Sequence, residues 1–108
     1  MTTEGSKVME LKKPAIAGTL ESSDVQIMIR PNAGEGRVIS LESDVKAMFG
    51  DAIVQTVNEV LDEFGVQDAS VDIHDKGALD HVIRARAQAA VCRAAETQYD
   101  WGKGDPRE

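Results

Sequence analysis

The fold that we expect for this chain is decided by one short segment, Gly18-Thr19-Leu20-Glu21-Ser22-Ser23-Asp24-Val25-Gln26-Ile27-Met28-Ile29-Arg30. In its second half Val25, Ile27 and Ile29 fall on every second residue, which places them on one face of a strand. Residues 15–20 form a shorter apolar run with weaker strand character. The polar residues 21–24 between the two runs are of types that favour a turn. The two runs are therefore predicted to pair as a β-hairpin.

The next segment extends the predicted sheet. Residues 31–36, Pro-Asn-Ala-Gly-Glu-Gly, are dense in turn formers. Residues 37–41 follow as another strand, with Ile39 and Leu41 on one face. The first three strands are therefore predicted to form a meander.

From residue 43 to residue 64 the apolar period changes to that of a helix. Apolar residues recur there at spacings of three and four: Val45, Met48, Phe49, Ala52, Ile53, Val57, Val60, Leu61 and Phe64. Ser43 is a plausible helix cap, and Asp44 suits the positive end of the helix dipole. Gly65 stands where a left-handed residue commonly ends a helix.

The last third of the chain predicts a further strand and a second helix. Residues 69–74 alternate again, and residues 79–96 carry a helical stripe. Its members are Leu79, Val82, Ile83, Ala87, Ala90 and Ala94. Between this strand and this helix, Asp75 is predicted to cap a turn in which Gly77 permits an unusual backbone angle. The whole pattern predicts an α+β fold in two layers, a small, mostly antiparallel sheet of three to four strands with two helices packed on one face.

The length of 108 residues allows one domain with a modest core. Residues 1–13 are predicted to be a flexible N-terminal extension, residues 14–96 the folded domain, and residues 97–108 a polar C-terminal tail. Tyr99 and Trp101 lie in that tail, and they are suited either to docking on a partner or to folding back on the domain's own core.

Charge and cysteine content narrow the class of partner. The net charge of -7 argues against nucleic acid, whose phosphates are bound by clustered Lys and Arg, and favours a basic protein surface. The single cysteine, Cys92, cannot form an internal disulfide, so the cytoplasm is the expected location. Residues 1–13 lack the apolar run of a signal peptide or a membrane span, so we expect no membrane partner.

Two sequence blocks resemble one known family. The first is Gly18-Thr19-Leu20-Glu21-Ser22-Ser23-Asp24-Val25, and the second is Asp75-Lys76-Gly77-Ala78-Leu79-Asp80 followed by Val82-Ile83-Arg84-Ala85-Arg86-Ala87. Together they resemble the acyl carrier (gamma) subunit of citrate lyase, and the resemblance runs from about Pro14 to Ala95. In that family a serine of the first block carries 2'-(5''-phosphoribosyl)-3'-dephospho-CoA through a phosphodiester. On the match, that serine is Ser22.

The resemblance implies a carrier with no catalytic residue of its own. The thiol of the prosthetic group would bear the acetyl or citryl group while citrate is cleaved to acetate and oxaloacetate. The implied partners are an alpha subunit that transfers the acyl group and a beta subunit that cleaves the citryl carrier. A prosthetic-group transferase and an acetate ligase that acetylates the thiol are implied as well.

The residues themselves leave two serines open. Attachment requires exposure and reach, because the transferase can supply the base, and Ser23 meets these demands as well as Ser22. Only the resemblance ranks Ser22 first. Glu21 and Asp24 are suited either to docking charges or to local roles, a solvated side chain for Glu21 and backbone bonding for Asp24.

Other carrier classes match less well. Ordinary fatty-acid carriers are four-helix bundles with an Asp-Ser-Leu motif at the start of a helix, and this chain has no such motif. Carriers of malonate decarboxylase use a similar prosthetic group, but their serine neighbourhood looks more like Gly-Ser-Gly-Asp. They remain the alternative within the carrier class, and an unmodified acidic adaptor that binds a basic partner is the alternative outside it.

Two arginines of the second helix have two interpretations. Arg86 and Arg93 lie near one side of the helix. Either their stems cover the sheet while their guanidinium groups reach water or pair with Asp72 or Asp75, or they grip the phosphates of the prosthetic arm. Arg84 is placed on the outer face, where Asp80 is a candidate partner.

Independent catalysis and metal binding are not supported. His74 and His81 face different ways from a strand and a helix, so they do not converge on a metal with Asp72, Asp75 or Asp80. Gly-x-Ser-x-Gly is absent, which argues against a hydrolase with a serine nucleophile. Cys92 is expected on the outer face of the helix as an unreactive thiol.

Overall fold

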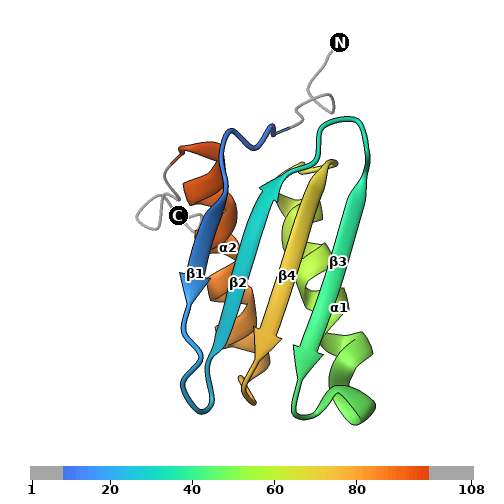
Figure 1. Cartoon of the computed structure of the whole chain (residues 1–108), viewed down its shortest axis with the longest axis vertical. Helices are drawn as coiled ribbons and strands as arrows, with labels where there is room; N and C mark the ends of the chain where they lie inside the picture. The colour runs from blue at the N-terminus through green and yellow to red at the C-terminus, as the bar shows by residue number, and fades with distance from the viewer. Residues whose placement is uncertain (1–8, 98–108) are drawn as a thin grey trace.

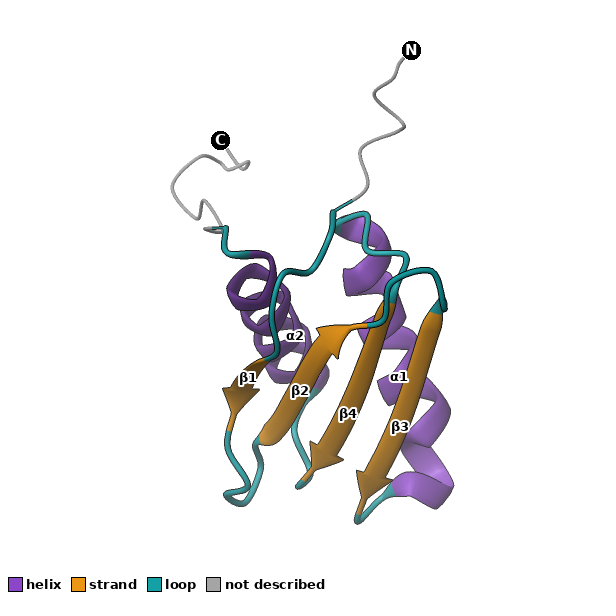
Figure 2. Cartoon of the chain, turned by 45° about the horizontal axis from the view of Figure 1, so that its top comes forward, coloured by secondary structure: helices purple, strands orange, loops and turns teal. Residues whose placement is uncertain are grey.

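A computed structural model describes residues 9–97 of the chain, apart from the side chains of residues 46 and 47. Its elements, in order, are β1 (Ala15–Gly18), β2 (Val25–Pro31), β3 (Arg37–Ser43), α1 (Lys46–Glu63), β4 (Ala69–Asp75) and α2 (Asp80–Ala95). Figures 1 and 2 show one sheet with both helices on the same face. The predicted two-layer α+β fold is confirmed, and the described part is not a helical bundle.

The order of the strands differs from the prediction. The hairpin of β1 and β2 is antiparallel as expected, but the sheet order is β1-β2-β4-β3. β4 lies between β2 and β3, pairing antiparallel with β2 and parallel with β3. The predicted meander is therefore wrong at β3. The parallel pair follows from the connection through α1, because a strand, a helix and a second strand return the chain in the same direction.

The core lies between the sheet and the helices. In β2 and β4 the alternate residues face the helices, and Val25, Ile27 and Ile29 are buried there as predicted. The full set of buried apolar core residues comprises Ala17, Val25, Ile27, Ile29, Ile53, Val57, Val60, Leu61, Val66, Ala69, Val71, Ile73, Ile83, Ala87, Ala90, Val91 and Ala94. The largest contributions are from aliphatic side chains, whose burial supplies most of the stabilisation in a domain of this size.

Helix α1 begins later than predicted. Ser43 ends β3, and its hydroxyl accepts a hydrogen bond from the Val45 amide at 3.1 Å. Asp44 consequently precedes the helix. Met48 and Phe49, which we expected in the core, are 79% and 51% exposed. Both residues lie in the first turn of α1, and their prediction as core residues is wrong.

Helix α2 matches its predicted bounds to within a residue. Leu79 precedes it and is 66% exposed instead of belonging to the core stripe. Cys92 is buried, so its predicted place on the outer face is wrong, and this burial raises the pKa of its thiol. The turn before the helix is confirmed: the Ala78 amide donates to Asp75 Oδ1 at 2.9 Å, and Gly77 has a φ of +88°.

The segment before β1 is bonded to the domain. The Met9 amide donates to the Gly65 carbonyl at 2.9 Å, and the Lys12 amide to the Ala94 carbonyl at 2.7 Å. Tyr99 and Trp101 lie outside the described residues, so their role stays a prediction. Within the described residues neither helix has the length and apolar character needed to cross a membrane.

Candidate functional site

The two serines lie on a tight turn between β1 and β2. The Asp24 amide donates to the Glu21 carbonyl at 3.0 Å, which closes a four-residue turn with Ser22 and Ser23 at its centre. Ser23 has a φ of +68°, which occurs at the third position of type II turns and is costly for a residue with a Cβ. Both serine side chains are exposed. Among the described residues neither hydroxyl makes a hydrogen bond.

The turn is anchored to the loop between β4 and α2. The Ser23 amide donates to the Lys76 carbonyl at 2.7 Å, and the Lys76 amide donates to the Asp24 carbonyl at 2.9 Å. These bonds continue the pairing of β2 with β4 past the last strand residues. The two sequence blocks that carry the family resemblance are thus in direct contact, although they are far apart in the sequence.

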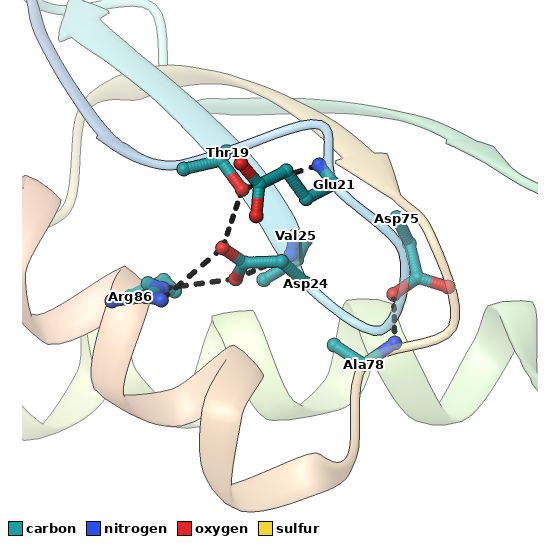
Figure 3. Close-up of polar contacts among 7 residues, drawn as sticks. All are labelled: Thr19, Glu21, Asp24, Val25, Asp75, Ala78 and Arg86. Carbon is teal, nitrogen blue, oxygen red and sulfur yellow. Dashed lines mark hydrogen bonds and ion pairs between the residues drawn. The ribbon is translucent and has the colours of Figure 1, made fainter.

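Asp24 holds the turn onto helix α2. Its carboxylate accepts hydrogen bonds from the Thr19 hydroxyl at 2.7 Å and from the Val25 amide at 2.7 Å. It also accepts a bidentate pair from Arg86, with Nε at 3.0 Å and Nη2 at 3.2 Å (Figure 3). Bidentate pairs of this kind add geometric specificity to the charge interaction. Asp24 therefore bonds to the local backbone, which was one of its two interpretations, and it also joins the turn to the distant Arg86.

The electrostatics follow from that geometry. The Arg86 hydrogen bonds, followed by the bond from Thr19, hold the pKa of the Asp24 carboxyl well below its usual range. A carboxylate with a lowered pKa stabilises the fold at pH values above its unfolded pKa of about 3.9, and that stabilisation is lost as the pH falls towards the folded pKa. The contribution of the Asp24–Arg86 pair to the free energy of unfolding therefore decreases as the pH falls below about 4.

We expect Asp24→Asn to reveal this dependence. At pH 7 the substitution removes the ion pair and is expected to lower the free energy of unfolding by about 1–2 kcal/mol. The difference from the wild type is expected to narrow as the pH falls from about 5 towards 2, because the Asp24 carboxylate of the unfolded wild-type chain takes up a proton there while the folded one stays ionised. Urea unfolding of both proteins across that range measures it. A difference that stays constant with pH would contradict the assignment.

Asp75 supports the loop beneath the turn. Asp75 is 2% exposed, and besides the bond from the Ala78 amide its carboxylate accepts a hydrogen bond from the Ser43 hydroxyl at 2.8 Å. It thereby joins the ends of β3 and β4 to the start of α2. Because Lys76 follows it directly, Asp75 fixes the backbone to which the Ser23 amide is bonded.

Gly18 lets the chain enter the turn. Its φ is +87°, and a Cβ built on it would lie 1.8 Å from the Val25 carbonyl oxygen and 3.3 Å from Arg86 Cδ. Only glycine fits a position with a positive φ and such a close backbone neighbour. The first residue of the family block is therefore required by the local geometry.

The two arginines predicted as contacts of the arm are placed differently. Arg86 lies against the serine turn, but its partner is Asp24 and not Asp72 or Asp75 as expected. Arg93 donates from Nη1 to the Ile16 carbonyl at 2.6 Å, on β1 and away from the turn. The predicted pair of Arg84 with Asp80 is present at 3.6 Å, alongside a closer contact of Arg84 with Glu59 at 2.8 Å.

The histidines do not form a site together. His74 pairs with Glu42 at 2.9 Å on the open face of the sheet, and His81 is exposed on α2. Within residues 9–97 no group of three or more His, Cys, Asp or Glu side chains could hold a metal ion. The two family blocks therefore meet at the serine turn and not at a histidine or metal site.

Two residues that shape the serine turn were not singled out by the sequence. Thr19 both donates to Asp24 and accepts the Glu21 amide at 3.2 Å, so it shapes the turn from inside (Figure 3). Lys76 anchors the turn through its backbone carbonyl and amide, and a pattern of side-chain types cannot predict such a contact. For Thr19 a signal was available: it is a hydroxyl residue five positions before Asp24, on the other side of the predicted turn.

Comparison with known proteins decides the family. Residues 12–94 match the family described as the malonate decarboxylase delta subunit. A citrate lyase acyl carrier protein of Clostridium perfringens is 50% identical over 95 residues, covering 87% of this chain and 94% of the relative. The same-named protein of Weissella paramesenteroides is 57% identical over 89 residues, covering 82% and 90%. That of Vibrio cholerae (serotype O1, strain M66-2) is 53% identical over 96 residues, covering 88% and 98%.

The chain belongs to the citrate lyase acyl carrier protein family. The resemblance stated from the sequence is confirmed. A member of the citrate lyase acyl carrier protein family is a carrier and not itself a catalytic subunit, as predicted. Membership also implies a prosthetic group.

One solved structure has a fold similar to that of this chain. The chain matches part of a Pseudomonas malonate decarboxylase hetero-tetramer in complex with malonate with a TM-score of 0.65 and 20% identity, covering 81% of this chain and 89% of that one. At this identity the match shows the shared fold alone. It agrees with the two-layer arrangement described above.

The residues of the turn fit a covalently attached group. An exposed serine hydroxyl that makes no hydrogen bond among the described residues is open to modification, and the anchored backbone holds it in a fixed place. Arg86 lies beside the turn, where its charge is paired with the Asp24 carboxylate.

Proposed function

We propose that this protein is the acyl carrier subunit of a citrate lyase and that Ser22 carries 2'-(5''-phosphoribosyl)-3'-dephospho-CoA. The observation that carries the proposal is an exposed hydroxyl at the tip of a turn whose backbone is bonded to Lys76 and whose Asp24 is bonded to Arg86. A fixed backbone with a free side chain is what a modifying enzyme can recognise. The 50–57% identity to the citrate lyase carriers supports the choice of complex.

The turn geometry favours Ser22 over Ser23. Ser23 donates its amide to Lys76 and has the positive φ, so its backbone is fully committed to the turn. Ser22 precedes it at the second position, and no hydrogen bond of its own amide or hydroxyl restrains it among the described residues. An enzyme can grip the Ser23 backbone region while the Ser22 hydroxyl enters its active site.

Attachment asks little of the carrier. The Ser22 Oγ forms a bond to the phosphorus of an activated donor, a polyphosphate form of the same group; the bond from that phosphorus to the rest of the polyphosphate, which is the leaving group, breaks, and the Oγ proton passes to a base of the transferase. When bound, the group supplies the thiol that bears the acyl group. The turn itself holds the attachment point, and the acidic Glu21 and Asp24 flank it.

Arg86 is the residue that we propose to interact with the phosphates of the arm. The Arg86 side chain is 42% exposed, and two of its nitrogens, Nε and Nη2, donate to the Asp24 carboxylate. Nη1 makes no hydrogen bond among the described residues, so it keeps donors for a phosphate oxygen. Arg93, which we also proposed from the sequence, is committed to the Ile16 carbonyl and is the weaker candidate.

The proposed partners are the alpha and beta subunits, the prosthetic-group transferase and the acetate ligase, all in the cytoplasm. Tethering suits this arrangement, because an attached acyl group has a high effective concentration at each partner's active site. The charge of -7 favours partners with basic docking surfaces.

Intact-mass measurement after co-expression with the citrate lyase prosthetic-group transferase tests the proposal. We expect the mass to increase by one prosthetic group, and fragmentation to locate it on Ser22. A chain whose mass never changes would instead be an unmodified adaptor. A modification located on Ser23 would show that the site is wrong by one residue.

A carrier of malonate decarboxylase is the second candidate, because the family description and the solved structure both name that complex. Assembly distinguishes the two. The purified carrier should associate with citrate lyase alpha and beta subunits in preference to malonate decarboxylase subunits, and the reverse preference would favour the second candidate.

A further inference from the structure

A shallow hollow lies on the open face of the sheet, at the start of β1. Its volume is about 430 Å³. We call it the β1 hollow, and its lining residues are Pro14, Ala15, Ile16, Met28, Ile29 and Arg30. Ile16 and Met28 are register partners, and their side chains lie on the open face because the neighbours Ala17, Ile27 and Ile29 are buried against the helices. Ile16 is 50% exposed.

The rest of the open face is mostly polar. An antiparallel arrangement can leave such a face in water. Its other side chains in β2, β3 and β4 are Gln26, Val38, Ser40, Glu42, Ser70, Asp72 and His74. The β1 hollow differs, because a proline, an isoleucine and a methionine gather there at one corner of the sheet. Apolar side chains that gather in this way mark a contact site.

The end of α2 lies beside the β1 hollow. The Lys13 amide donates to the Ala94 carbonyl at 3.2 Å, and the Lys13 ammonium group pairs with Glu96 at 3.6 Å. Pro14, the first lining residue, follows Lys13 directly. Figures 1 and 2 show the end of α2 next to the segment that enters β1. The chain therefore leaves the described domain close to the hollow.

The sequence beyond Thr97 contains the chain's only Tyr and only Trp, Tyr99 and Trp101. One residue, Asp100, separates them, so an extended segment would place both rings on one side and the carboxylate on the other. An extended chain spans at most about 3.6 Å per residue, which limits the Cα of Tyr99 to about 7 Å and that of Trp101 to about 14 Å from the Cα of Thr97. Both rings can reach the β1 hollow.

Other hollows suit these rings less well. One lies between the starts of the two helices, and Phe49 and Leu79 are among its lining residues. It is at the other end of α2, whose 16 residues span about 24 Å, so it is beyond the reach of both rings. Another is lined by residues 9–11 and by Asp68, and its acidic Glu10 and Asp68 would repel Asp100.

We propose that residues 98–108 fold back over the edge of the sheet and that Tyr99 and Trp101 cover the β1 hollow. The rings would pack on Ile16 and Met28, which gives the exposed apolar side chains a partner within the chain. A segment of the same chain is favoured over a separate protein, because a short tether gives an effective concentration on the order of millimolar.

Two arginines define how the segment would lie. Arg93 donates to the Ile16 carbonyl at 2.6 Å, so that carbonyl is not available to pair with an added strand, and the segment would cross the edge of β1 instead. Arg30 lines the hollow and is held by Asp72 at 3.1 Å, which fixes a flat guanidinium group on which a ring can stack. The hollow is at the opposite end of β1 from Gly18, so the cover would leave the serine turn open.

Fluorescence of the full chain tests the inference, because Trp101 is the only tryptophan. Its emission should be shifted to the blue of that of a synthetic peptide of residues 98–108, and acrylamide should quench it less. Ile16→Gln should move both quantities towards the values of the peptide. Val38→Gln is the matched control: Val38 is 56% exposed on the same face of the other edge strand, and its substitution should leave both quantities at the wild-type values.

A second measurement leaves the hollow unaltered. In proton NMR spectra the ring current of a docked Trp101 should shift the methyl resonance of Met28 upfield, and Trp101→Leu should remove that shift. The methyl resonance of Met48, which is 79% exposed on α1, should be the same in both proteins. Circular dichroism of every variant verifies that the domain is folded.

Four outcomes would overturn the inference. The wild-type emission and quenching could equal those of the peptide, or Val38→Gln could release Trp101 as fully as Ile16→Gln does. The protection could depend on protein concentration, which would assign the hollow to the tail of a second copy. It could also arise only after citrate lyase subunits are added, which would assign it to a partner. The inference does not rest on the proposed function, because the mass gain on Ser22 is measured separately and should be the same in a chain that ends at Thr97.

Discussion

Replacing Ser22 with alanine is expected to abolish the covalent mass gain completely. The Ser22 Oγ is the proposed nucleophile, and no other atom of the side chain can form the phosphodiester. The fold should be retained, because the side chain is exposed and makes no hydrogen bond among the described residues. Intact mass and a urea unfolding curve of the same sample measure both results. A complex assembled with this variant should lose citrate cleavage even though every partner subunit is unchanged.

The neighbouring serine provides the control. Ser23→Gly removes a hydroxyl but relieves the positive φ of +68°, so the variant should gain the full mass. It should also be as stable as the wild type or more stable by up to about 1 kcal/mol, since glycine adopts this backbone angle freely. Retention of the mass in Ser22→Ala with loss in Ser23→Gly would reverse our assignment.

Replacing Gly18 with alanine is expected to have the largest effect on stability. The added Cβ would lie 1.8 Å from the Val25 carbonyl oxygen, at a φ of +87°. That oxygen belongs to the backbone of β2 and cannot rotate away, so the end of β1 must separate from β2. We expect a loss of at least about 3 kcal/mol in the free energy of unfolding, which places it among the severe substitutions. Chemical denaturation measures it, and modification at Ser22 should be slower in the same variant.

Gly34→Ala isolates the steric part of that effect. Gly34 also has a positive φ, +77°, but nothing lies within 4 Å of a Cβ built there. Its substitution should cost only the backbone strain, about 1 kcal/mol. If Gly18→Ala is no more destabilising than Gly34→Ala, the close approach to Val25 is not a constraint on the turn.

Local features of this fold could be predicted from the sequence because they depend on near neighbours. Alternation placed Val25, Ile27 and Ile29 on the buried face, and Asp75 was correctly assigned as the cap of its turn. Alternation of apolar and polar residues indicates which face of the sheet a side chain lies on, but it does not indicate which strand is the neighbour. For that reason the parallel pairing of β3 with β4 was missed.

The site was predictable in part for the same reason. The exposed serine turn follows from its residue types, but the partner of Arg86 does not, because helix α2 and the turn meet only in the folded chain. Apolar period alone also placed Phe49 and Leu79 in the core, although they are 51% and 66% exposed near the starts of the two helices. Cys92 shows the converse, since packing buries a residue that the helical period puts outside.

The anchoring of the turn by the β4–α2 loop has a consequence for the order of events in the cell. Asp24 is bonded to an arginine 62 residues further along the chain, and β2 lacks one of its two neighbours until β4 has been synthesised. A growing chain on the ribosome would therefore present Ser22 in an unsupported hairpin long before the turn acquires its final shape. On the proposed function, a transferase that recognises the anchored turn would modify the completed domain and not the growing chain.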